Sequence, residues 1–235
     1  MKRFWREVTV EAVSGAGTEG WRVALDGRGI KTALGRPQVV PGRPLSKALA
    51  DEWRVQPEEI DPTGFVFRDL ADYALDVVAP TRDEAIERLL RFAETDTLCY
   101  RAEPDEPLAG RQRALWEPLL KRAETRYGVR FERLAGVMHR PQPAATLERL
   151  RAALAEHDSF VLAALQTMAS LAASLTVALA GLEPAADAEA LWKAANLEED
   201  WQAEQWGEDA EAQALRERRL HEFAAALRFA QLARE

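Results

Sequence analysis

The segment that most constrains this fold is a charge-free stretch in the second half of the chain, Ser159–Leu182. It is long enough to cross a bilayer as a helix. Its abundant alanine, its serines and threonines and its acidic flanks, Asp158 and Glu183, argue against insertion, because a spanning helix favours basic residues on one side. A helix that is apolar on every side is also typical of the centre of a helical domain. We therefore expect one long buried helix and no stable membrane insertion.

The N-terminal part of the chain has the two-residue period of β-strands. Residues 8–12 and 21–25 alternate between apolar and polar side chains. The dipeptide Asp26-Gly27 then indicates a hairpin, with Ile30–Leu34 as its return strand. Together with an extended piece at Pro37–Pro41, these segments predict a small twisted sheet or partial barrel of about four to six short strands.

From about residue 65 onward the pattern changes to the helical period. The predicted fold class is therefore α+β: a small β-rich N-terminal domain, residues 1–64, followed by a larger all-helical domain, residues 65–235. The expected helices, including one short helix in the first domain, are Leu45–Trp53, Phe67–Ala79, Arg82–Glu94, Gly110–Tyr127, Ala144–His157, Ser159–Leu182, Ala186–Trp206 and Asp209–Ala233.

Charge and cysteine content restrict the partners and the compartment. The formal net charge of −8 argues against nucleic acid as a partner, because binding it requires a basic face. The single cysteine, Cys99, leaves no intrachain disulfide and favours a reducing compartment. The first residues have neither the apolar stretch of a secretory signal nor the acid-poor helix of an organelle presequence. We expect a bacterial cytoplasmic protein, or a mitochondrial matrix protein if the chain is a processed organelle protein.

The sequence contains one nucleotide-binding pattern, G-x-G-x-x-G at Gly15, Gly17 and Gly20. A dinucleotide loop must leave a strand and open a helix, whereas an alternating strand follows these glycines. We interpret the pattern as a hairpin loop. A phosphate loop of the G-x-x-x-x-G-K-[ST] type is absent from the sequence, so we expect no ATP-driven activity.

Residues suited to metal binding or nucleophilic catalysis are few. His139, His157, His221 and Cys99 are scattered, which does not match the spacing of zinc ligands. Cys99 has no histidine near it in sequence, and we interpret it as a small buried residue. We therefore expect no catalytic residue, no metal and no cofactor.

The segment Ala190–Asp209 is the most informative for function. On a single helix, Trp192, Glu199 and Trp206 would share one face, and Trp201 would lie on the opposite face. A surface helix normally carries one apolar stripe, whereas this one would carry two. Such a helix is either enclosed within the fold or presents one stripe to a partner, and both interpretations stay open. An ionised Glu199 between tryptophans would need an internal arginine or a basic group on a partner.

Two motifs, ETDTLCYR at Glu94–Arg101 and EEDWQAEQWGED at Glu198–Asp209, lead to a family resemblance. With them the chain resembles the alpha-subunit assembly chaperones of mitochondrial and alphaproteobacterial ATP synthase, the Atp-twelve family. The similarity runs in order along nearly the whole chain. Its other segments are Arg3–Val10, Leu25–Thr32, Ala50–Trp53, Glu58–Pro62, Trp116–Leu119 and Arg126–Val129.

The resemblance implies a β domain, a helical domain and no catalysis. It also implies a transient partner, the unassembled ATP synthase alpha subunit, whose apolar face is covered until the beta subunit arrives. We expect the chain to be a monomer that works without ATP. Within the helical domain we expect two groups of functional residues. Those expected to contact the client are Glu198, Glu199, Asp200, Trp201, Glu204, Gln205 and Trp206; those expected to organise the domain junction are Asp96, Thr97, Tyr100, Arg101 and Trp116.

Two other functions stay open from the sequence. A small-molecule enzyme with its site in the cleft between the two domains would show a perturbed carboxylate pair in a closed pocket. A structural subunit would stay in its complex. A broad open face with exposed tryptophan would instead favour the chaperone.

Overall fold

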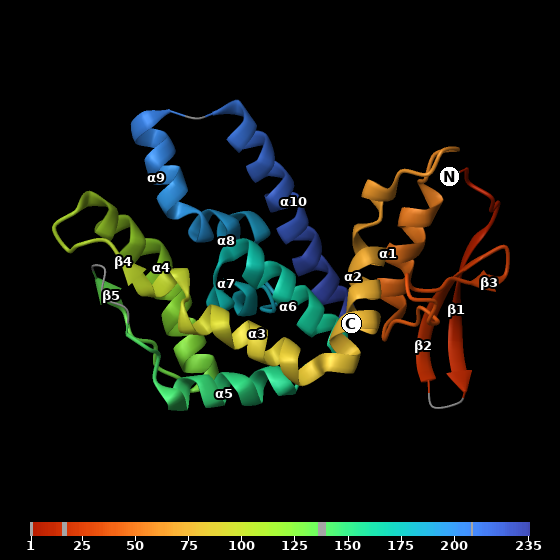
Figure 1. The fold of residues 1–235 in the computed structure, drawn as a ribbon, viewed down its shortest axis with the longest axis horizontal. Coiled ribbons are helices and arrows are strands. Elements are labelled where there is room, and N and C mark those ends of the chain that lie inside the picture. Colours follow the sequence, from red (N-terminus) through yellow and green to blue (C-terminus); the bar gives the residue numbers. More distant parts are fainter. Residues whose placement is uncertain (1, 16–17, 136–139, 208) are drawn as a thin grey trace. The chain divides into compact units, whose positions relative to one another are not determined.

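The computed structural model of the chain describes residues 2–15, 18–135, 140–207 and 209–235 (Figure 1). The chain forms a small N-terminal sheet followed by helices, which confirms the predicted α+β class. Contacts between residues divide it into two compact units. The first contains residues 1–82, 158–164 and 228–235, and the second contains residues 83–157 and 165–227. The limits expected from the sequence, 1–64 and 65–235, remain a prediction.

The first unit contains a three-stranded antiparallel sheet in the order β1-β2-β3. Strand β1 (Val8–Gly15) pairs with β2 (Thr18–Leu25) along their whole length, and β2 pairs with the short β3 (Arg28–Gly29). The Asp26-Gly27 hairpin is confirmed: both residues have positive φ, 48° and 77°, as the tight turn that joins twisted strands requires. The hairpin interpretation of the G-x-G-x-x-G pattern also holds, because β1 ends at Gly15, β2 begins at Thr18 and the two strands pair up to these residues; Gly17 itself lies outside the described residues.

The predicted return strand Ile30–Leu34 is wrong. In the described part of this region the chain makes only isolated bridges, at Lys31 with Pro37 and at Trp21 with Val40. Residues 32–36 form a turn in which the Thr32 N–H donates to the Arg36 carbonyl at 2.8 Å. This turn, with Pro37 lacking an N–H, interrupts the ladder. The described sheet therefore has three strands instead of four to six.

Helix α1 (Arg43–Arg54) contacts β1 and β2 and confirms the short helix expected there. Its apolar face packs into a core of aromatic rings. The ring centroids of Trp5 and Trp53 lie 5.0 Å apart, and those of Trp53 and Phe65 lie 4.6 Å apart. A short 3-10 turn (Pro62–Gly64) leads to α2 (Val66–Tyr73), which continues as a π-helical segment (Ala74–Val78) and a 3-10 turn (Ala79–Thr81).

The remaining helices make up most of the second unit, with a two-residue parallel pair, β4 (Tyr100–Arg101) and β5 (Leu134–Ala135), added to the expected all-helical arrangement. A 3-10 turn (Thr97–Cys99) precedes β4. The helices are α3 (Arg82–Glu94), α4 (Pro107–Tyr127), α5 (Ala144–Ala155), α6 (Ser159–Ala172), α7 (Leu175–Ala180), α8 (Ala188–Ala195), α9 (Leu197–Trp206) and α10 (Ala210–Ala233).

The charge-free segment Ser159–Leu182 is buried as expected, but the prediction of a single helix is wrong. The chain breaks between α6 and α7 at Ala173, which has a positive φ of 46°. Ser174 then caps α7, its hydroxyl accepting the N–H of Val177 at 3.0 Å. Within the described residues, no helix has the length and apolar character needed to cross a membrane.

Candidate partner-binding surface

The segment Ala190–Trp206 forms two helices, α8 and α9, so the prediction of one helix is wrong. The break lies at Asn196, whose φ and ψ of −103° and 23° are not helical. The Asn196 side-chain amide donates to the carbonyl oxygen of Trp192 at 2.9 Å, a local bond that competes with helix continuation.

This break separates the tryptophans that a single helix would align. Trp192 is buried in the second unit, with its ring centroid 5.7 Å from that of Phe223. Trp206, at the end of α9, has 81% of its surface exposed. Glu199 is also exposed, so its carboxylate is not enclosed between tryptophans as a single helix would require.

Four of the seven predicted contact residues are held by side chains of the same unit. The Glu198 carboxylate accepts a hydrogen bond from the Gln112 amide at 2.7 Å. Asp200 forms an ion pair with Arg216 of α10. Arg111 of α4 holds the other two, Trp201 and Glu204.

Arg111 donates to both carboxylate oxygens of Glu204, at 2.7 and 2.8 Å. Its guanidinium also lies over the Trp201 ring, 4.4 Å from the centroid, in a cation–π contact. These contacts fix the orientation of the middle of α9 against α4. The sequence pattern missed Arg111, since 93 residues separate it from Glu204.

The other three predicted contact residues, Glu199, Gln205 and Trp206, are exposed. Within the described part of the chain, none of the three side chains has a hydrogen bond, ion pair or ring contact. The predicted residues therefore form two groups: four whose side chains contact other parts of the same unit, and three whose side chains are exposed and make no such contact with any described residue.

Helix α9 is strongly acidic. Its sequence, LEEDWQAEQW, contains four carboxylates and no basic residue. Partial burial raises the pKa of Glu198, and the adjacent charge of Glu199 raises it further, while the Gln112 amide opposes both. The bond from Arg111 lowers the pKa of Glu204. The exposed side of α9 therefore presents negative charge beside the indole of Trp206.

An open hollow of about 790 Å³, here called the α9 groove, lies along this helix where it meets α4. Its apolar side chains include Leu115, which is 38% exposed, and Leu197. Charged side chains from both helices complete its wall. The lining residues are Arg111, Ala114, Leu115, Lys193, Leu197, Asp200, Ala203, Glu204 and Gly207.

The residues expected at the domain junction fall into two sites within the second unit. Asp96 is fully buried; its Oδ1 accepts the Ser174 hydroxyl at 2.7 Å and its Oδ2 accepts the Thr176 N–H at 2.8 Å. Thr97 donates from its N–H and its hydroxyl to the Ala173 carbonyl, at 3.2 and 2.9 Å. This motif holds the break between α6 and α7 in place.

Tyr100 and Arg101 form β4, and the Arg101 guanidinium lies 5.3 Å from the centre of the Trp116 ring. The buried Trp116 donates its indole N–H to the Ala194 carbonyl at 2.6 Å and so ties α4 to α8. The expected role of both sites at a domain junction remains a prediction.

Cys99 is buried and burial raises the pKa of its thiol, in agreement with the interpretation of a small core residue. Within the described ranges, no group of three or more histidine, cysteine or carboxylate side chains could hold a metal ion. His139 lies outside these ranges.

Comparisons with known proteins agree with this architecture. A family model described as ATP12 chaperone protein matches residues 2–124. Protein atp12, mitochondrial, of Schizosaccharomyces pombe is 28% identical over 188 residues, a match that covers 75% of this chain and 63% of the relative, so the chain spans less than two thirds of that relative's length.

Solved structures resemble the whole chain. The crystal structure of Atp12 from Paracoccus denitrificans is 34% identical, with a TM-score of 0.92, and the match covers 99% of this chain and 98% of that one. The Atu1473 protein of Agrobacterium tumefaciens is 39% identical, with a TM-score of 0.92, over 98% of this chain and 85% of that one.

Proposed function

The chain belongs to the ATP12 chaperone family, and from this premise we propose that it is an ATP-independent assembly chaperone of ATP synthase. In this proposal it binds the unassembled alpha subunit, prevents its aggregation and releases it when the beta subunit arrives. Because the family is one of chaperones and not of enzymes, the alternative of a small-molecule enzyme loses its basis. The bacterial solved relatives support a bacterial cytoplasmic location as part of the same proposal.

The observation that carries this proposal is the exposure of Trp206 at the end of an acidic helix. A large apolar side chain left 81% exposed gains little burial from the folded chain itself. Tryptophan is also among the residues that contribute most to binding at protein interfaces. Beside it, the α9 groove offers an open apolar floor to a partner side chain.

The charges of α9 define the kind of client surface that fits. The free carboxylate of Glu199 and the acidic character of the helix favour a face with basic residues around an apolar patch. Trp206 and the groove would cover the apolar patch, and the carboxylates would pair with the basic rim. Arg111 would hold Trp201 and Glu204 in the orientation that the client meets.

Release follows from competition for the same client face. A chaperone that masks an orphan apolar patch stabilises the free subunit only while it is bound. The interface between the alpha and beta subunits buries more apolar area than an exposed tryptophan and an open groove can cover. The beta subunit therefore displaces this chain from the alpha subunit once it is present. Release therefore needs no nucleotide hydrolysis by this chain.

Co-expression with the alpha subunit from the same source tests the proposal. We expect the alpha subunit to stay in the supernatant and to co-purify with this chain. An alpha subunit that aggregates equally with and without the chain would refute it. Co-expression with the isolated beta subunit is the matched control, and the proposal predicts no protection there.

A further inference from the structure

A second hollow, of about 250 Å³, lies in the second unit beside β4 and α4, and three arginines line it. We call it the arginine hollow. Its lining contains three guanidinium groups and one carboxylate, that of Glu117, which pairs with Arg101 and Arg133. The lining residues are Arg101, Ala102, Pro104, Ala109, Arg113, Glu117, Arg133 and Ala135.

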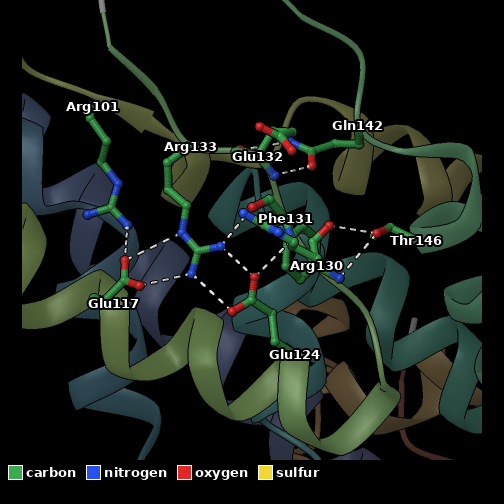
Figure 2. A network of polar contacts seen from close by, with 9 residues as sticks. All are labelled: Arg101, Glu117, Glu124, Arg130, Phe131, Glu132, Arg133, Gln142 and Thr146. Carbon is green, nitrogen blue, oxygen red and sulfur yellow. Dashed lines mark hydrogen bonds and ion pairs between the residues drawn. The ribbon is translucent and has the colours of Figure 1, made fainter.

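One of the arginines is saturated with partners. Figure 2 shows Arg133 between two carboxylates of α4, those of Glu117 and Glu124. The Arg133 guanidinium donates to Glu117 at 3.0 Å and to Glu124 at 2.5 and 3.2 Å. It also donates to the Phe131 carbonyl at 2.7 Å. Arg133 is therefore a fixed part of the wall, with its charge compensated.

The other two arginines keep unused donors. Among the described residues, the hydrogen bond of the Arg101 side chain is a single one of 3.3 Å to Glu117, which already serves Arg133 (Figure 2). The Arg101 Nε is buried and has no hydrogen-bond partner. Arg113 is exposed and forms no ion pair within the described ranges.

The guanidinium groups that line the hollow also repel one another. Burial lowers the pKa of Arg101; Glu117 opposes this, while the charges of Arg133 and Arg113 lower it further. Counting Glu124, which pairs with Arg133, the three guanidinium groups meet two carboxylates and leave one excess positive charge, in a chain whose net charge is −8.

We propose that the arginine hollow is a binding site for an oxyanion, a carboxylate or a phosphate group, held by the guanidinium groups of Arg101 and Arg113. The planar fork of donors in arginine matches the paired oxygens of both groups. The ion pair with Glu117 keeps Arg101 in place, and its cation–π contact with Trp116 restricts its rotation. The oxyanion supplies the charge that the wall lacks.

This site is separate from the proposed client surface. Arg111 of the α9 groove and Arg113 of the arginine hollow are two positions apart on α4 and so point to different sides of the helix. Loss of oxyanion binding would leave the client proposal intact, and the reverse is also true.

The arginine side-chain Nε–H resonances of the full chain offer a direct test. We expect the Arg101 resonance to shift saturably on titration with inorganic phosphate, with N-acetylglutamate amide, or with both, at constant ionic strength. The probe that binds more tightly identifies whether the natural group is a phosphate or a carboxylate. Absence of a saturable shift with both probes would overturn the proposal.

Two variants make the test specific. Arg113→Gln, at an exposed position that leaves the fold intact, should weaken binding about tenfold, as loss of a charge-assisted pair of bonds implies. Arg91→Gln, an exposed arginine on α3, removes the same charge away from the hollow and should leave the affinity unchanged. Equal weakening by both variants would show general screening by charge and would contradict the assignment.

Discussion

The carboxylate of Asp96 accepts a hydrogen bond from the hydroxyl of Ser174 at 2.7 Å, across 78 residues of sequence. Both side chains are buried, and the Ser174 oxygen in turn accepts the N–H of Val177. This chain of bonds fixes the place where the long apolar segment stops being one helix.

Asp96→Asn should therefore destabilise the fold by about 2 kcal/mol. The Oδ1 atom of Asp96 accepts hydrogen bonds from Leu98 N–H and the Ser174 hydroxyl, and its Oδ2 atom accepts one from Thr176 N–H. In the Asp96→Asn variant one of these oxygens becomes an NH₂ group, which would point at a backbone N–H donor in either orientation of the amide. Denaturant unfolding checks this. Ser174→Ala removes the bond to Asp96 and the capping bond from Val177, but it leaves the carboxylate with its Leu98 and Thr176 donors and should cost less. An equal or larger loss for Ser174→Ala would contradict the central place of Asp96.

Trp206→Ala should leave stability almost unchanged and weaken client binding. Because 81% of the side chain is exposed, the free energy of unfolding should change by less than about 0.5 kcal/mol. Affinity for the alpha subunit should fall about tenfold or more, as expected at a tryptophan hot spot. The matched control is Leu34→Ala, which removes an apolar side chain that is 71% exposed on the first unit. Equal affinity for both variants would remove Trp206 from the contact surface.

Glu199→Lys should fold normally and protect the alpha subunit poorly. The side chain is exposed and free of partners within the described residues, so reversing its charge disturbs no internal contact. Repulsion from a basic client rim should reduce binding in low salt more than in high salt. Glu156→Lys makes the same charge change at an exposed position after α5 and should behave as the parent protein. Undiminished protection by folded Glu199→Lys would refute this contact.

Arg111→Met should loosen α9 and leave most of the fold intact. The substitution removes the two bonds to Glu204 and the cation–π contact with Trp201 while keeping an apolar stem. Hydrogen exchange should become faster in the amides of α9 and stay unchanged in α4. Glu204→Gln tests the same pair from the other side, and the effects of the two substitutions should be less than additive. Full additivity would show that the pair does not orient α9.

Glu52 should make the stability of the first unit depend on pH. Its carboxylate accepts the N–H groups of Phe67 and Arg68 at 2.6 and 2.9 Å, at the start of α2. Burial nevertheless raises its pKa to about 7. The native state then holds a proton that the unfolded state loses at lower pH, so stability should fall as pH rises from about 4.5 to 7, by at most about 3 kcal/mol.

Glu52→Gln isolates this contribution. The difference in free energy of unfolding between the parent and the variant should shift in favour of the variant as pH rises through that window. Urea unfolding at a series of pH values measures the difference. A difference that stays constant from pH 5 to pH 8 would show that the Glu52 carboxyl titrates normally in the folded protein.

Local patterns were enough to predict the elements whose causes are local. The Asp26-Gly27 turn needs positive φ at both positions, which this residue pair tolerates, and the hairpin formed where expected. The burial of Ser159–Leu182 followed from its lack of charge. The breaks in the helices could not be predicted from the hydrophobic period of the sequence alone. The break at Ala173 depends on contacts with Asp96 and Thr97, which are far away in sequence.

The candidate surface was predicted in composition but not in arrangement. The acidic and tryptophan-rich segment was recognised, yet its apparent two faces came from extending one helix through Asn196. The partner of Glu204 and Trp201, Arg111, lies on a helix that only the folded chain brings near. Without that contact, the sequence could not separate residues that shape α9 from residues free to meet a client.

The most direct test of the account follows aggregation of the purified, unassembled alpha subunit by light scattering while this chain, and then the beta subunit, is added. We expect an equimolar amount of the chain to suppress scattering without nucleotide, and the beta subunit then to displace the chain into the free fraction. Scattering that continues unchanged in the presence of the folded chain would contradict it, as would a chain that stays bound after the alpha and beta subunits have assembled.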